Sequence, residues 1–97
     1  MKAVFIAYNQ ANTERVEYML DMLELRGFTQ WVDVNGRGSE TGTPRMGTHT
    51  WPERNSAILT MVPDEKVDIL LEKVQRMDAI NEEVGIRAFV WDVFKSV

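Results

Sequence analysis

Hydrophobic positions along the chain repeat with two different periods, and together they predict six elements. Four stretches rich in β-branched and aromatic residues are typical of strands. Two stretches with apolar residues at i, i+3, i+4 and i+7 are typical of amphipathic helices. The predicted strands cover residues 2–8, 28–34, 56–62 and 86–97, and the predicted helices cover residues 13–26 and 63–83. Asn12 is placed to cap the first helix, while Gly27 and Gly85 are placed to end the two helices.

The order βαββαβ is that of an α+β, ferredoxin-like sandwich. We therefore expect a four-stranded antiparallel sheet with two helices on one face and a long loop between the second and third strands. At this length the whole chain, residues 1–97, is expected to form a single domain.

Residues 35–54, between the second and third strands, show neither period. This stretch holds four of the six glycines and two of the three prolines, so it cannot present an apolar face to a core. A loop of this length in a compact domain is usually either a binding loop or disordered. We expect it to project from a hairpin and to carry the function.

Three of the predicted strands have apolar side chains on both alternating sets of positions. Phe5 is followed by Ile6, Ile58 by Leu59, and the last strand carries Phe89 and Trp91. Two helices cover only one face of a sheet, so large side chains are left on the other face. Burying one such side chain is worth roughly 1.5–3 kcal/mol. We therefore predict an obligate homo-oligomer, most simply a homotrimer.

Composition excludes several classes of protein. The net charge of −4 disfavours nucleic acid, whose phosphates require a basic face. The absence of cysteine excludes disulfides, thiolate catalysis and Cys-ligated zinc. No run of about 18 apolar residues spans a membrane, and no cleavage site follows the N-terminal strand, so no signal peptide is expected. These features favour a cytoplasmic protein.

Three short motifs resemble those of the PII signalling family. The sequence V-N-G-R-G at 34–38 looks like that family's V-x-G-x-G entry into its T-loop, the loop that contacts targets. The sequence V-P-D-E-K-V at 62–67 looks like the junction of its third strand and second helix, and G-F-T at 27–29 is similar to the G-x-T that begins its second strand. The resemblance covers nearly the whole chain.

This resemblance implies a trimer used in signal transduction and nitrogen regulation. Such a trimer binds a small effector, usually an adenine nucleotide, in clefts between subunits. It contacts a target, such as a membrane transporter or an enzyme, through residues 36–54. The implied effector-binding residues are Thr29, Gly36, Arg37, Gly38 and Arg87. The implied loop and target contacts are Arg45, Met46, Thr48, Trp51 and Arg54. We expect Trp51 to pack against the adjacent subunit.

The chain departs from the family where the glycine-rich phosphate loop, similar to T-G-x-x-G-D-G-K, would stand. Of that motif only Gly85 is kept, and Asp78, Glu82 and Glu83 would repel a triphosphate. In some family members a T-loop tyrosine is nucleotidylated, and we expect no counterpart of that tyrosine in this chain. We also expect no counterpart of the family's basic C-terminal segment. We therefore expect ATP binding to be weak or absent, although Arg87 stands near the position of the family's phosphate-binding lysine.

Two alternatives remain open. His49, the only histidine, suits a divalent metal such as Zn, Cu or Ni if copies of the chain share it. This alternative is a metal-responsive trimer, similar to the CutA family or to proteins associated with heavy-metal efflux. The other alternative is a small ferredoxin-like enzyme with His49 as a base. No catalytic motif supports it, so we expect no enzymatic activity.

Overall fold

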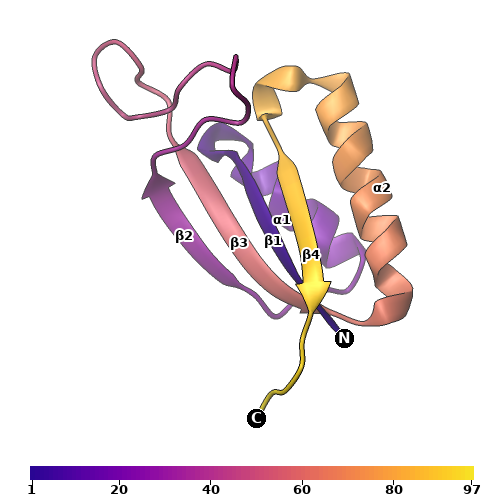
Figure 1. Ribbon diagram of the computed structural model, residues 1–97. Coiled ribbons are helices and arrows are strands. Elements are labelled where there is room, and N and C mark those ends of the chain that lie inside the picture. The colour runs from indigo at the N-terminus through magenta and orange to yellow at the C-terminus, as the bar shows by residue number, and fades with distance from the viewer.

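A four-stranded antiparallel sheet forms the body of the protein in the computed structural model, which describes residues 1–97 (Figure 1). Its strands are β1 (Lys2–Asn9), β2 (Thr29–Val34), β3 (Asn55–Val62) and β4 (Arg87–Asp92). They lie in the order β2-β3-β1-β4, with every neighbouring pair antiparallel. The predicted ferredoxin-like fold is confirmed.

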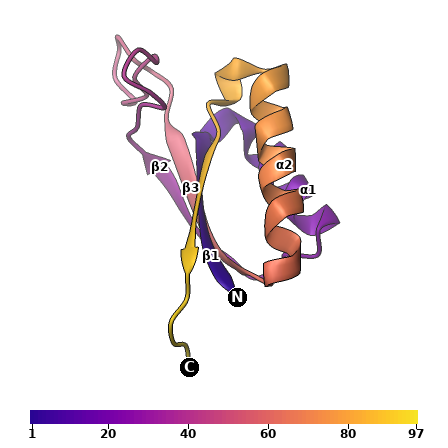
Figure 2. The same ribbon diagram turned by 45° about the vertical axis from the view of Figure 1, so that its right-hand side comes forward.

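Two helices, α1 (Thr13–Met22) and α2 (Asp64–Ile80), lie on the same side of this sheet (Figure 2). The predicted stripes face inward, since Val16 and Leu20 of α1 and Leu70 and Val74 of α2 are all buried. Neither helix is long and apolar enough to cross a lipid bilayer.

The core lies between the helices and one face of the sheet. That face contributes fully buried side chains from alternate positions, which are Val4, Ile6, Tyr8, Ile58 and Val62. Ile6 pairs with Ile58 in the register of β1 and β3, so these two side chains stand together beneath the helices. The central strands β1 and β3 are therefore stabilised by the burial of these side chains as well as by the hydrogen bonds between the strands.

The opposite face carries no helix and is apolar, as predicted. Phe5 pairs with both Leu59 and Phe89 across neighbouring strands, and Phe89 is 59% exposed. Trp91 and Met61 flank this row and are 50% and 44% exposed. A contiguous patch of this kind is unusual on a monomer. We name these five residues the open face.

The first helix is shorter than predicted. It ends at Met22, and Glu24 rather than Gly27 adopts the left-handed conformation, with φ 58°. The amide of Glu24 donates to Asp21 O, and the amide of Leu25 donates to Leu20 O, which together form a Schellman motif. Leu25 is buried in the core beside Leu20. This apolar contact stabilises the early end of the helix.

Asn12 stands at the N-cap position of α1, as predicted, but its side chain makes no capping hydrogen bond, because a 3₁₀ turn (Gln10–Asn12) precedes the helix. The side chain that caps is Asn9, at the start of this 3₁₀ turn, whose oxygen accepts from the amide of Ala11 at 3.0 Å. At the other end of the chain, β4 stops at Asp92 rather than continuing to Val97. Beyond Asp92, no strand lies beside the chain to continue the ladder with β1, whose first paired residue is Lys2.

Candidate functional site

The loop between β2 and β3 is pinned at its base. Gly36 and Arg45 form an isolated antiparallel bridge, with N···O distances of 2.9 and 2.7 Å for its two hydrogen bonds. This bridge divides the loop into a first lobe, residues 37–44, and a second lobe, residues 46–54. The first lobe lies beside the α2–β4 junction, and the tip of the second lobe projects away from it (Figure 1). The loop projects from a hairpin, as expected, but it is not structureless.

The second lobe contains a tight turn that presents His49. The amides of Met46 and Thr48 both donate to Trp51 O, at 3.3 and 2.9 Å, and the amide of Trp51 donates to Thr48 Oγ1 at 3.0 Å. Gly47 adopts φ 64°, a conformation that side chains disfavour. His49 and Trp51 are both exposed on this turn.

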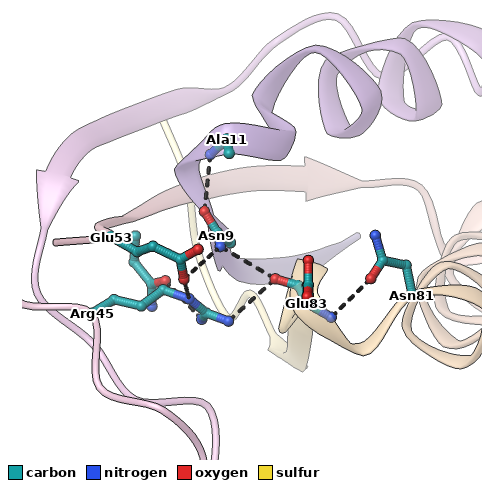
Figure 3. Close-up of polar contacts among 7 residues, drawn as sticks. Asn9, Ala11, Arg45, Glu53, Asn81 and Glu83 are labelled. Atoms are coloured by element: carbon teal, nitrogen blue, oxygen red, sulfur yellow. Dashed lines mark hydrogen bonds and ion pairs between the residues drawn. The ribbon is translucent and has the colours of Figure 1, made fainter. Parts of the chain in front are cut away.

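Arg45 turns inward from the loop and is only 6% exposed. Its guanidinium donates to Asn55 Oδ1 at 3.0 Å and to the carbonyl of Glu83 at 3.3 Å. The first contact joins the loop to the start of β3, and the second joins it to the 3₁₀ turn (Glu82–Val84) that follows α2. Figure 3 shows the Arg45 guanidinium beside Glu53 and reaching toward Glu83. Arg45 is therefore the side chain that holds the loop to the domain.

The Nε atom of Arg45 is the one buried side-chain polar atom without a hydrogen-bond partner. The carboxylate of Glu53 lies 3.6 Å from it, close enough for an ion pair but not for a hydrogen bond. Asn9 approaches the same carboxylate from β1, donating from Nδ2 to Glu53 Oε2 at 3.2 Å and to the Glu83 carbonyl at 3.3 Å (Figure 3). An acceptor that hydrogen-bonds Nε would therefore have to enter beside the Glu53 carboxylate or displace it.

Two glycines make room for this arrangement. A Cβ at Gly85 would lie 2.4 Å from the guanidinium of Arg45, and Gly85 also adopts φ 56°. A Cβ at Gly36 would lie 2.2 Å from the amide nitrogen of Asn55. The position of Gly85 after α2 thus serves both to end the 3₁₀ turn and to admit the arginine.

A polar cleft of about 830 Å³ opens beside Arg45, between the loop and the α2–β4 junction. Its charged lining consists of two arginines and four carboxylates, Arg45, Arg87, Glu53, Asp78, Glu82 and Glu83. Arg87 is already paired with Asp78, at 3.0 Å. Gly38, Gly42 and Trp51 complete the loop side of the cleft. The cleft can therefore offer guanidinium and backbone donors to an anion, within an acidic surround.

The residues expected at the site divide into two groups. Of the expected effector-binding residues, Gly38 and Arg87 line this cleft, and so do Arg45 and Trp51, which were expected as loop and target contacts. Gly36 lies just behind it in the bridge, and Arg37 folds back to donate to Gly42 O at 2.8 Å. Thr29 lies elsewhere, at the opposite end of β2, in a second depression with Phe28, Leu59, Met61 and Pro63.

The expected loop contacts are also divided. Arg54 donates to the carbonyl of Asp33 at 3.2 Å and so braces the end of β2. Met46, Thr48 and Trp51 lie on the second lobe, whereas Arg45 is buried and does not face outward in this conformation. Sequence reasoning missed Asn9, Asn55 and Glu53. Their roles depend on Arg45, and no local spacing connects them to it.

No group of three or more His, Asp or Glu side chains stands close enough in this chain to hold a metal ion. His49 therefore belongs to no such group within one copy. A metal site at His49 would need residues from further copies.

Comparison with known proteins agrees with the fold. CPII from Thiomonas intermedia K12, a nitrogen regulatory PII-like protein, is similar in its structure bound to ADP and bicarbonate. The identity is 27%, the TM-score is 0.75, and the match covers 95% of this chain and 84% of that one. Its structure bound to ADP, AMP and acetate matches with 26% identity, a TM-score of 0.75 and the same coverage.

A PII-like signalling protein from Thermus thermophilus shares the fold at 21% identity, with a TM-score of 0.66 over 95% of this chain and 84% of that one. No curated protein sequence matches the chain. The family model described as nitrogen regulatory protein P-II matches residues 1–97. The chain therefore belongs to the P-II family of nitrogen regulatory proteins.

Proposed function

We propose that this protein is a PII-like regulatory trimer that binds a small anionic effector in the cleft beside Arg45 and signals through the loop. The observation that carries the proposal is the buried guanidinium of Arg45, which lines the cleft with one N–H unused. A buried donor without a partner costs free energy that a bound acceptor recovers. The same side chain holds the loop, so an anion that contacts Nε acts directly on the loop base.

The charges of the cleft favour an effector with few phosphates. Four carboxylates and two arginines line it, and one arginine is engaged by Asp78. A triphosphate would bring a large negative charge into an acidic surround, whereas AMP or ADP brings less. The similar CPII protein binds ADP, AMP, bicarbonate and acetate. We infer the same ligand classes here, an adenine mono- or diphosphate and a small carboxylate.

Two features support completion of the site by a second copy. The open face leaves five large apolar side chains on the strands without a helix to cover them. Thr29 lies in the depression at the far end of β2, together with Leu59 and Met61, which line the same face. Packing of copies through this face would bring one copy's Thr29 depression toward another copy's cleft. The trimer thus gives Thr29 its role in effector binding.

The second lobe is the part of the loop that reaches a target. Met46, Thr48 and Trp51 lie there, beyond the pinned base. The target class we propose, from the family, is a membrane transporter or an enzyme, approached from the cytoplasm. The family regulates other proteins, so no catalytic role is assigned to the cleft.

Trp51 lines the cleft and provides the assay. Titration with AMP, ADP, ATP and bicarbonate, followed by tryptophan fluorescence, should give saturable changes. AMP or ADP should bind roughly tenfold or more tightly than ATP. The control is Trp51→Phe, because Trp31 and Trp91 also fluoresce. The variant should lose the signal while calorimetry still detects binding.

Substitution of the arginines separates their roles. Arg45→Lys keeps the charge but loses the planar fork of donors, so it should weaken effector binding by about tenfold or more. Arg87→Gln should have a smaller effect, because Arg87 is already paired. Tight ATP binding with no preference for AMP or ADP, or affinities unchanged in Arg45→Lys, would refute the proposal.

The metal alternative is tested by the same titration with Zn, Cu and Ni. We expect no fluorescence change that depends on His49, since a single copy gathers no ligand set around it. A saturable response in the wild type that His49→Ala abolishes would replace the nucleotide proposal with the metal-responsive trimer.

A further inference from the structure

A second concave surface lies on the helix side of the molecule, away from the loop cleft and the open face. It is a groove of about 630 Å³ between α1 and α2. Its apolar lining is Tyr18, Met19, Met22, Met77 and Ile80. Tyr18, Met22 and Ile80 are 66%, 61% and 73% exposed, although each belongs to a regular helix. We call this surface the helix groove.

The rim of the helix groove is basic in a chain whose net charge is −4. Arg15, Lys73 and Arg76 line it, against the single carboxylate of Glu14. Arg76 is paired with Glu72 at 3.2 Å, but Arg15 and Lys73 form no ion pair with any side chain. Two free cations therefore flank an apolar surface.

We propose that the helix groove docks an amphipathic helix of a partner protein, with an apolar stripe flanked by acidic residues. The apolar stripe would cover the five apolar side chains, and the acids would face Arg15 and Lys73. Helices laid into apolar grooves are a recurrent mode of recognition. Three of the five apolar residues are methionines, and flexible thioethers adapt to the shape of a partner.

Charge and position argue against a second copy of this chain as the occupant. Two copies meeting through their helix grooves would place the cations of one rim against those of the other, which is repulsive. Both helices lie on one side of the sheet (Figure 2) and the open face lies on the other, so association through the open face leaves the helix groove outward. The groove therefore remains available in the assembled protein.

The test uses two designed helical peptides with the same leucine stripe. One carries Glu at the flanking positions, and the matched control carries Lys at the same positions. Binding to the full-length protein is measured by fluorescence anisotropy. The Glu peptide should bind roughly tenfold or more tightly than the Lys peptide.

Methionine methyl resonances locate the binding surface. The six methionines divide evenly, since Met19, Met22 and Met77 line the groove and the other three lie outside it. Only the three groove methyls should shift when the Glu peptide is added.

Charge reversal gives the decisive control. Arg15→Glu/Lys73→Glu should invert the preference, so that the Lys peptide becomes the tighter ligand, while sedimentation stays that of the wild type. Tyr18→Ser/Met22→Ser should weaken both peptides, because these exposed side chains provide the apolar contact. Failure of both peptides to bind, equal affinity for both, or binding only to vesicles containing anionic lipid would overturn the proposal.

Discussion

The two faces of the sheet are built from the same strands, yet they are finished differently. Ile58 is fully buried beneath the helices, whereas Leu59, the next residue of β3, points to the open face. Each face carries an apolar row from alternate positions, but only one has helices above it. The difference shows that the two helices cover only one of the two apolar rows. The other row is the surface through which we propose that copies associate.

The largest expected effect comes from the covered face. Ile58→Ala should lower the free energy of unfolding by about 2–5 kcal/mol, because the surrounding core cannot close the cavity. Urea denaturation measures it. The matched control is Leu59→Ala, which should cost much less when measured on the monomer. Equal losses of unfolding free energy at the two positions would contradict the difference between the two faces.

The open face should govern association rather than folding. Phe89→Ser/Trp91→Ser removes two large exposed side chains, each worth roughly 1.5–3 kcal/mol when buried. Association should weaken by about 100-fold or more, with the folded monomer retained. Sedimentation velocity together with far-UV circular dichroism checks both parts. If the wild-type protein sediments as a monomer at micromolar concentration, the proposed trimer is wrong and the substitutions have no association to weaken.

A smaller effect is expected from a polar pair on the covered face. Tyr8 is fully buried, and its hydroxyl accepts a hydrogen bond from Gln30 Nε2 at 3.0 Å. Tyr8→Phe should cost about 0.5–1.5 kcal/mol, the usual net value of such a bond. A double-mutant cycle with Gln30→Ala isolates the pair. If the stability losses of the two substitutions are strictly additive, the hydrogen bond contributes nothing to stability.

The smallest effect is expected at the start of α2, one of the two helices that cover the sheet. Asp64 lies 2.6 Å from the N-terminal amine, and this hydrogen bond and charge hold the pKa of its carboxyl below the ordinary value. A carboxyl with a lowered pKa in the folded state adds stability at neutral pH and loses it as the pH falls through that pKa. Asp64→Asn should therefore flatten the fall of melting temperature in acid. Asp68→Asn, which removes an unpaired carboxylate, should not.

Periodicity was sufficient to predict the order of elements, the inward stripes of both helices and the apolar open face. It could not place the end of α1. A glycine was available at Gly27, but Leu25 gains burial only if Glu24 takes the left-handed conformation. Propensity favours the glycine, and the tertiary contact of Leu25 outweighs it.

The site was predicted in outline only. The glycine-rich loop indicated its location, and Gly38, Trp51 and Arg87 do line the cleft. The burial of Arg45 has no local signal, because its partners Asn55 and Glu83 are distant in sequence and each looks unremarkable alone. Gly85, which leaves space for the guanidinium, and Gly36, which leaves space for Asn55, are the signals of this arrangement in the sequence.

The bridge between Gly36 and Arg45 also limits how far the loop extends. An unpinned loop over 35–54 could carry its tip roughly 35 Å from the sheet, since an extended chain advances about 3.5 Å per residue and must return. With Arg45 fixed, the second lobe spans less than half of that length, so its tip reaches only about 15 Å. A target bound by the second lobe, as proposed above, would therefore have to come nearly into contact with the end of the sheet, unless release of Arg45 lengthens the loop.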